Sequence, residues 1–195
     1  MNFEDLSRPP LAVGIAGSPG PGPSRSHVLL DRALDRLDKA GFVTRRIELA
    51  LFPADALLGR VRDAGLEAAI AAVSEARIVL AATPVYRASY SGLLKVFFDL
   101  LPVDALEGRV AIPIATGGTF AHQLMLDHAL RPLFASLGAR VVSAGVYGTQ
   151  TQFADGRPEA SLELRLARAV DEAIALSPTQ AAFYPTTPHV SEVTR

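Results

Sequence analysis

The sequence predicts an α/β domain, a three-layer sandwich in which a five-stranded parallel sheet lies between two layers of helices. Short apolar runs alternate with longer segments whose apolar residues recur at helical spacing, and this alternation occurs five times in a row. The chain has 195 residues, of which 49% are hydrophobic, so it can bury a sizeable core in a single domain. Crossovers between parallel strands are right-handed, and we therefore expect helices on both faces of the sheet.

Each expected strand is a short apolar run that suits a strand covered on both faces. These runs are Leu11–Ala16, Phe42–Leu49, Ile78–Ala82, Arg109–Ala115 and Arg140–Tyr147. The segments that follow them have the apolar spacing of helices: Ser26–Ala40, Leu66–Ala76, Ser91–Leu101, Phe120–Leu137 and Leu162–Leu176. No repeat or linker divides the chain, so residues 1–195 are predicted to form one domain, with its core at about 11–176 and an irregular tail at 178–195.

Composition excludes several classes of function. The formal net charge is −1 and no block of like charges occurs, which argues against a nucleic-acid groove or a basic membrane patch. The absence of cysteine excludes disulfides, thiolate chemistry and cysteine-bound metals. The first residues, MNFEDLSRPP, lack the pattern of a signal peptide, and no apolar run approaches the roughly 18 residues of a membrane span. We expect a soluble, cytoplasmic protein.

A loop of glycine, proline and serine follows the first expected strand and has the sequence GSPGPGPSRS at 17–26. Glycines let the backbone approach a ligand, serine hydroxyls donate hydrogen bonds, and the start of a helix offers unpaired N–H groups. Arg25 adds a cation, so the loop suits one phosphate monoester. It matches neither the nucleoside-triphosphate P-loop nor a clean G-x-G-x-x-G pattern. The alternative is a simple turn in which Ser24 or Ser26 caps the helix.

Two further loops follow expected strands and complete a predicted crevice. Thr83 and Pro84 end the third strand, and the polar and aromatic stretch 85–91 comes next. The glycine-rich turn 115–119, ATGGT, follows the fourth strand, and its bare backbone leaves room for close approach. Loops at the carboxyl ends of neighbouring parallel strands meet at the switch point of the sheet, where such folds bind ligands. A flat ligand with a polar edge, such as a flavin ring, suits this crevice.

These residues carry a resemblance to a known family. The stretches GSP…PSRS (17–26), ATPVYRASYSGLLK (82–95), DLLP (99–102) and ATGGTFAHQLMLDHALRP (115–132) resemble the NAD(P)H-dependent FMN reductases of flavodoxin-like fold. They are most similar to the reductase component of alkanesulfonate and methanesulfonate monooxygenase systems. The resemblance covers about Leu11 to Leu176 and implies a sheet of strand order 2-1-3-4-5.

The resemblance also implies a set of binding residues. Those that hold the FMN phosphate are Ser18, Ser24, Arg25 and Ser26. Those that line the flavin are Pro84, Val85, Tyr86, Arg87 and Ser91, and those that meet its pyrimidine edge are Thr116, Gly117 and Gly118. No catalytic side chain and no metal are implied, because hydride passes between two cofactors; Arg87 is the candidate contact for the nicotinamide nucleotide. The chain departs from the family at Gly20, where an arginine is common, and its first loop is about one residue longer.

The function implied is reduction of FMN by NAD(P)H, with the reduced flavin passed to a separate monooxygenase of organosulfur metabolism. One alternative is a flavoprotein that keeps FMN and reduces quinones, azo dyes or metal oxyanions. Another is a flavodoxin-like electron-transfer module, although such carriers are usually strongly acidic and this chain has a net charge of only −1.

The helix expected at Ser91–Leu101 is apolar almost all round, with Lys95 and Asp99 as a charged pair on one face. One sheet cannot cover such a girdle, so we expect a partner subunit of a dimer or tetramer to cover part of it. The alternative is that two helices of the same chain cover it.

The fourth expected helix carries His128 directly after Asp127. In the alkanesulfonate reductases a tyrosine inserted there produces a π-bulge near the tetramer interface, and the methanesulfonate-type relatives are similar in using histidine. The alternative is an ordinary amphipathic helix in which Asp127 and Arg131 pair across one turn. His122 and His128 lack the i,i+3 or i,i+4 spacing of metal ligands, so no zinc site is expected.

Overall fold

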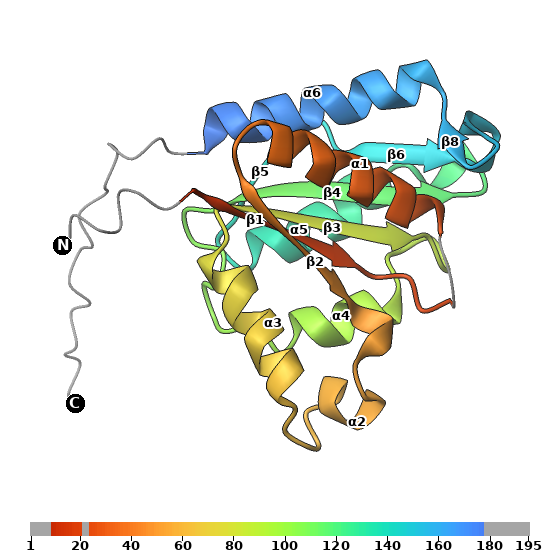
Figure 1. Cartoon of the computed structure of the whole chain (residues 1–195). Helices are drawn as coiled ribbons and strands as arrows, with labels where there is room; N and C mark the ends of the chain where they lie inside the picture. The colour runs from red at the N-terminus through yellow and green to blue at the C-terminus, as the bar shows by residue number, and fades with distance from the viewer. Residues whose placement is uncertain (1–8, 21–23, 178–195) are drawn as a thin grey trace, which may run out of the picture.

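The computed structural model describes residues 9–20 and 24–177, so the expected irregular tail at 178–195 lies outside the described residues. Its main sheet has the flavodoxin-like order β2-β1-β3-β4-β5, with every pairing parallel (Figure 1). The strands are β1 (Leu11–Ala16), β2 (Val43–Glu48), β3 (Ile78–Pro84), β4 (Val110–Gly117), β5 (Arg140–Val141) and β6 (Val146–Thr149). The predicted fold class and strand order are confirmed.

Helices cover both faces of this sheet, as expected (Figure 1). One face carries α1 (Arg25–Lys39) and α6 (Ala160–Leu176), and the other carries α3 (Ala64–Glu75), α4 (Gly92–Phe98) and α5 (Arg131–Ala135). Successive residues of a strand point to opposite faces, and two separate buried clusters result. The sequence patterns did not reveal the short helix α2 (Ala54–Leu57), the 3₁₀ turns Leu49–Leu51 and Gln150–Gln152, or the small hairpin of β7 (Phe153–Ala154) and β8 (Arg157–Pro158).

Side-chain caps fix where three of the helices begin. Ser24 caps α1, Asp63 caps α3 by accepting from Leu66 N at 2.8 Å, and Ser91 caps α4 by accepting from Leu94 N at 3.1 Å. The helix expected to start at Leu66 therefore starts two residues earlier, after Asp63. Ser91 is the cap of its helix and not its first residue, so α4 is shorter than the expected Ser91–Leu101.

The fifth strand was predicted as one run, Arg140–Tyr147, and that prediction is wrong. Two short strands, β5 and β6, pair with β4 in turn, and residues 142–145 separate them. Pro113 lies in β4 opposite this gap; it has no N–H for a ladder, and its ring lies 3.2 Å from a Cβ built on Gly145. Arg131 donates to the carbonyl of Val142 at 2.9 Å, so a side chain satisfies backbone that the ladder leaves free.

The fourth helix, expected at Phe120–Leu137, is likewise not continuous. It consists of a 3₁₀ turn (Phe120–His122), a π-helix (Leu126–Leu130) and α5. Pro132 has no N–H to bond to the carbonyl of His128, four residues before it, which favours an irregular turn there. The π-helix implied by the resemblance is therefore present, and the Asp127–Arg131 pair of the alternative is present with it, at 3.2 Å.

The two phenylalanine rings of α4 are covered by this chain itself. Phe97 is fully buried and Phe98 is 3% exposed, and the Phe98 ring packs edge-on against Phe134 of α5 at 5.4 Å between centroids. Neighbouring helices of the same chain thus cover these two rings, as the alternative held. Leu93, Val96 and Leu100 of the same stretch are only partly buried, so the expectation that a partner subunit covers part of this helix stays a prediction. The predicted pair of Lys95 and Asp99 is present on the exposed face, with Nζ 2.5 Å from Oδ1.

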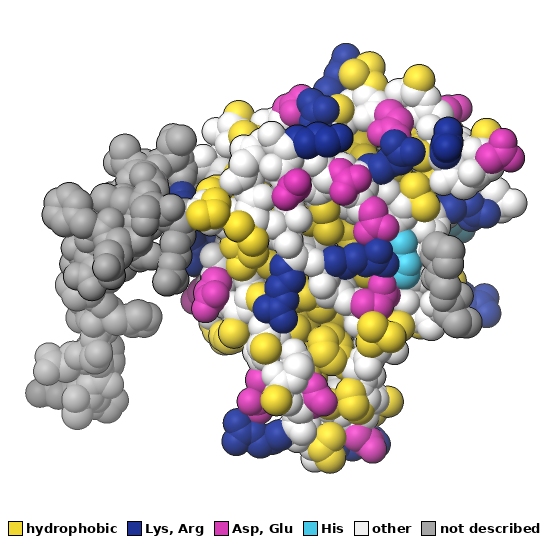
Figure 2. Space-filling view, in the orientation of Figure 1, with side chains coloured by type: hydrophobic (Ala, Val, Ile, Leu, Met, Phe, Trp, Pro, Cys, Tyr) yellow, Lys and Arg dark blue, Asp and Glu magenta, His cyan; other side chains and the backbone are white. Residues whose placement is uncertain are grey.

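Positive and negative side chains are interspersed over the face that Figure 2 shows, without a patch of one sign. Ion pairs such as Arg36–Asp171, at 2.8 Å, join α1 to α6 on the surface. Within the part of the chain that the structure describes, no helix has both the length and the apolar content to span a membrane.

Candidate functional site

The three loops predicted to form a crevice are joined to one another at the carboxyl ends of β1, β3 and β4. Gly17 N donates to Ala82 O at 2.8 Å, which ties the first loop to β3. Val85 N donates to Thr116 O at 2.8 Å, which ties the second loop to the third. The structure thus confirms that these loops converge at the switch point between β1 and β3, where open α/β sheets bind ligands.

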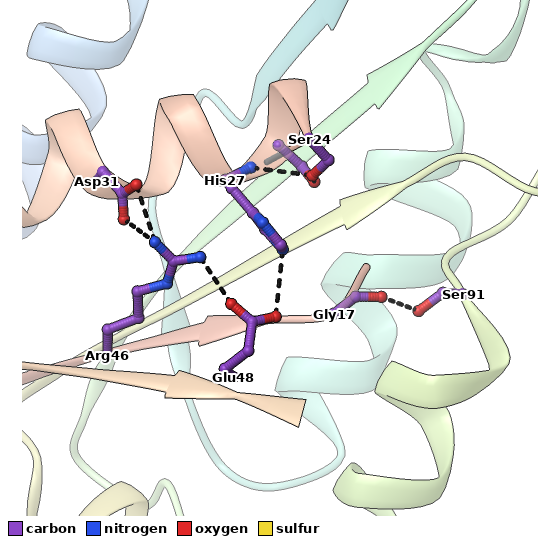
Figure 3. Close-up of polar contacts among 8 residues, drawn as sticks. Gly17, Ser24, His27, Asp31, Arg46, Glu48 and Ser91 are labelled. Carbon is purple, nitrogen blue, oxygen red and sulfur yellow. Dashed lines mark hydrogen bonds and ion pairs between the residues drawn. The ribbon is translucent and has the colours of Figure 1, made fainter. Parts of the chain in front are cut away.

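Ser91 and Thr83 hold the first and second loops together beneath the surface. The buried Ser91 hydroxyl donates to Gly17 O at 2.5 Å (Figure 3). The same hydroxyl accepts from Leu94 N. Ser91 N in turn donates to Thr83 Oγ1 at 2.9 Å. Because both side chains are fully buried, these bonds fix the first loop relative to α4 with little competition from water.

The first loop places its hydroxyl groups around the start of α1. Ser24 Oγ accepts from His27 N at 3.3 Å and lies 2.8 Å from Ser26 Oγ. Ser18 and Ser26 are buried, whereas Arg25 is exposed on the first turn of the helix. The capping role considered for Ser24 is therefore confirmed, and a cap leaves the other N–H groups of the first turn available to an anion.

The second loop ends in a tight turn that presents an arginine. Tyr86 and Ser89 exchange backbone hydrogen bonds of 2.9 and 3.0 Å, and the two residues between them, Arg87 and Ala88, have φ values of +50° and +61°. Such left-handed backbone is costly for residues with a Cβ, by about 1–2 kcal/mol each. Tyr86 is 49% exposed at the base of this turn, and Arg87 is exposed at its tip.

A buried tyrosine supports the third loop from below. Tyr147 of β6 is fully buried, and its hydroxyl donates to Thr119 O at 2.8 Å. A Cβ built on Gly117 would lie only 2.1 Å from that hydroxyl, so only glycine fits there. Burial raises the pKa of the Tyr147 phenol, which keeps it protonated as a donor at neutral pH. Thr116 is buried, while Gly118 is exposed with open space around it.

Several residues that shape the site were not singled out from the sequence. Thr83 and Tyr147 were assigned only to a strand end, and their bonds join segments distant in sequence. Phe120, directly after the glycine-rich turn, is 50% exposed and its ring lies 6.2 Å from that of Tyr147. The signal that the sequence offered for Phe120 was an aromatic residue directly after a glycine-rich turn. Glu48 at the carboxyl end of β2 also went unnoticed.

A further surface feature lies away from the three loops. A shallow groove of about 210 Å³ lies between α1 and α6, but it surrounds the carboxyl half of α1, away from the three loops. Two of its arginines pair across the helices, Arg32 with Glu163 and Arg36 with Asp171. Among the described residues no group of three histidine, aspartate or glutamate side chains is placed to hold a metal ion.

Comparison with known proteins agrees with this geometry. The sequence matches the family model "NADPH-dependent FMN reductase" over residues 10–154. The chain is 39% identical to an FMN reductase (NADPH) of Escherichia coli K12 over 164 residues, which are 82% of this chain and 85% of that one. The crystal structure of the apo form of an NADH:FMN oxidoreductase, EmoB, superimposes with a TM-score of 0.79 at 38% identity and covers 87% of this chain and 91% of that one.

A flavodoxin of Streptococcus pneumoniae TIGR4 matches with a TM-score of 0.59 at 18% identity, over 85% of this chain and 98% of that one, and so shares the fold alone. The family match covers all three strand-end loops, and the full-length relatives match over most of the described residues. The chain therefore belongs to the NADPH-dependent FMN reductase family.

Proposed function

We propose that this protein is an enzyme that reduces FMN with NAD(P)H and binds both nucleotides at the three joined loops. The observation that supports this most strongly is the way buried bonds bring hydroxyl groups, a helix start and bare glycine backbone to one edge of the sheet. These groups match the three parts of FMN: a phosphate, a flat ring and a polar pyrimidine edge.

The phosphate belongs at the first turn of α1, held by Ser18, Ser24, Ser26 and Arg25. Helix N–H groups and hydroxyls donate to the phosphate oxygens, and Arg25 contributes a charge-assisted bond. Gly20 stands where the family commonly has an arginine. Among the described residues, a Cβ added at Gly20 would meet Ser18 Oγ alone, at 4.0 Å. Arg25 is then the main cation of this phosphate site.

The ring belongs between the second and third loops. Pro84, Val85, Tyr86 and Arg87 form its wall, and the backbone of Thr116, Gly117 and Gly118 meets the pyrimidine edge. The open space around Gly118 supports this fit. Val85 also supports it: its Cβ lies 3.5 Å from a Cβ added at Gly117, so the wall and the glycine turn lie side by side. Ser91 was predicted to line the flavin; since its hydroxyl is already bonded twice within the chain, we assign it a positioning role.

FMN, when bound, supplies the redox chemistry by accepting a hydride from the nicotinamide. The chain's own residues bind and orient the two nucleotides and exclude water, which is where a protein contributes to such a reaction. The exposed Arg87, held at the tip of a strained turn, is the candidate contact for a phosphate of NAD(P)H. The name of one relative gives NADPH and the name of another gives NADH, so we propose either nucleotide as the hydride donor.

The reduced flavin passes, in this proposal, to a separate flavin-dependent monooxygenase that cleaves organosulfur compounds such as alkanesulfonates or methanesulfonate. The support is the resemblance of the 82–102 and 115–132 stretches to reductase components of those systems. A homo-oligomer is also part of this proposal. Phe120 and Leu124, which precede the π-helix, are 50% and 62% exposed, and we infer that a second copy of the chain covers them.

Steady-state kinetics test the proposed activity. Purified protein should oxidise NADH or NADPH only when FMN is added, and free FMN should behave as a saturable substrate. A permanently bound flavin with fast quinone turnover would favour the alternative of a quinone, azo-dye or oxyanion reductase. Binding of FMN without any direct oxidation of NAD(P)H would favour an electron-transfer module, and failure to bind FMN would overturn all three.

A further inference from the structure

A charged cluster built around one buried histidine, His27, lies beside the first loop, near the start of α1 and the end of β2 (Figure 3). His27 points from α1 toward Glu48, and its Nε2 lies 3.4 Å from Glu48 Oε1. The His27 side chain is only 6% exposed, yet Nε2 has no partner with hydrogen-bond geometry among the described residues. A buried ring nitrogen left in this way is uncommon in a folded protein and needs an explanation.

Arg46 determines how strongly Glu48 acts on this imidazole. Its Nη2 donates to Glu48 Oε2 at 2.6 Å, and its Nη1 donates to both oxygens of Asp31, at 2.7 and 2.9 Å. The guanidinium thus neutralises much of the carboxylate charge near His27. Burial is the largest influence on the His27 pKa and lowers it; Glu48 raises it, Arg46 lowers it and Asp31 raises it, with a net decrease.

His27 is also part of the structure that forms the phosphate cradle. Its backbone N–H donates to Ser24 Oγ at 3.3 Å, and that hydroxyl lies 2.8 Å from Ser26 Oγ. A phosphate bound at this turn therefore lies next to the backbone of His27, whose ring lies beside the Glu48 carboxylate. Two like charges brought together in a partly buried site repel each other, and a cation between or beside them relieves that repulsion.

We propose that His27 takes up one proton when the phosphate dianion of FMN binds at the first turn of α1, and that the resulting imidazolium offsets the charges of the phosphate and of Glu48. The inference rests on the proposed function, because it assumes that FMN binds at this loop. The proton comes from solvent and goes to the free nitrogen of the ring, so Nε2 gains a donor that it can direct at Glu48 Oε1. The residue acts in positioning and charge balance, and it takes no part in hydride transfer.

This coupling fixes the sign of the pH dependence. Binding that takes up a proton weakens as pH rises, with a limiting slope of about tenfold in Kd per pH unit for one proton. The effect is best measured above pH 7, because a phosphate monoester has its second pKa near 6 and is a dianion there both free and bound. A histidine that is neutral in the free protein and charged in the complex then gives an uptake close to one proton per FMN.

Calorimetric titration of the full chain with FMN in buffers of different ionisation enthalpy, at pH 7.5, measures this uptake directly. Riboflavin, which has the ring but lacks the phosphate, should bind without it. His27→Gln should abolish the uptake and flatten the dependence of Kd on pH, and Glu48→Gln should reduce it. The matched control His128→Gln alters an exposed histidine of the π-helix and should retain the full uptake.

The outcomes separate the inference from the proposed function. Uptake that His27→Gln abolishes and riboflavin lacks supports both. FMN binding without proton uptake, or uptake that persists in His27→Gln, overturns the inference and leaves the proposed function standing. Absence of FMN binding overturns both. If His27→Gln does not fold, the comparison of FMN with riboflavin on the natural chain still decides, because equal uptake for the two ligands excludes the phosphate as its cause.

Discussion

The first loop, at 17–26, and the third loop, at 115–119, differ in how the fold supports them, although both follow buried strands and both contain glycine. The first presents hydroxyls and a helix start, and polar bonds such as Ser91–Gly17 hold it at its base. The third presents bare backbone, and a single large side chain, Tyr147, supports it from below. One loop is built to meet charge and the other to leave space, so they should respond differently to substitution.

The largest effect is expected in the third loop, from Gly117→Ala. The new Cβ would lie 2.1 Å from the buried Tyr147 hydroxyl, so the loop or the ring must move. Overpacking of this kind costs about 1–3 kcal/mol, and FMN affinity should fall on the order of 100-fold. Equilibrium titration with FMN measures this. Gly92→Ala, at the exposed first residue of α4, is the matched control, because nothing lies within 4 Å of its added Cβ, and its Kd should stay close to that of the natural chain.

A double variant sharpens this result. Tyr147→Phe removes the oxygen at 2.1 Å but leaves the ring carbon that lies 3.1 Å from the same Cβ. Adding Tyr147→Phe to Gly117→Ala should therefore restore part of the lost affinity. Equal affinity of Gly117→Ala and the natural chain would show that the third loop does not depend on this close approach.

The second largest effect is expected at the base of the first loop, and on stability. Ser91→Ala removes a helix cap worth about 1 kcal/mol and leaves the carbonyl of Gly17 without its donor. The free energy of unfolding should fall by about 2 kcal/mol, as measured by urea denaturation. Ser89→Ala, in the same loop but with its contacts made by the backbone, should stay within about 0.5 kcal/mol. A fully stable Ser91→Ala would contradict the anchoring role.

The contrast between the first and third loops also explains how much of the candidate site the sequence could predict. The glycine and serine patterns predicted all three loops and their convergence, because parallel strands end at one edge of a sheet. They could not predict Tyr147 or Thr83, whose roles arise from contacts between segments far apart in the chain. A lone tyrosine in an apolar run reads as core, and only the structure reveals that its hydroxyl reaches the glycine turn.

The errors in the fold likewise come from contacts between segments that are distant in the sequence. Apolar periodicity predicted Arg140–Tyr147 as one strand, whereas the effect of Pro113 on its neighbour depends on strand register. Periodicity likewise predicted a helix at 91–101 that is apolar almost all round, but it did not show which surfaces cover Phe97 and Phe98. Packing of α5 against α4 answered that within one chain. The resemblance, rather than periodicity, indicated the π-helix.

A smaller effect is expected when the support of the third loop loses only its hydrogen bond. Tyr147→Phe keeps the buried ring and removes the donor to Thr119 O, which costs about 1 kcal/mol. Thermal unfolding should show a lower midpoint, and FMN affinity should fall by about three- to fivefold as the turn loosens. An unchanged midpoint together with unchanged affinity would show that packing of the ring alone supports the loop.

The smallest expected effect is a difference between the two loops in how stability depends on pH, in the absence of ligand. Burial lowers the pKa of His27 below its ordinary value near 6.5. At pH values between the lowered pKa and 6.5, the unfolded chain therefore binds more protons than the folded chain. Stability should therefore be unaffected by this residue above about pH 7 and should fall as pH decreases below about 6.5. His27→Gln should lessen that decrease between pH 7 and 5.5 in thermal unfolding. Tyr147→Phe should follow the slope of the natural chain, because burial raises the pKa of that phenol and it stays protonated throughout. Parallel slopes for His27→Gln and the natural chain would mean that the imidazole beside the first loop is not held neutral by burial.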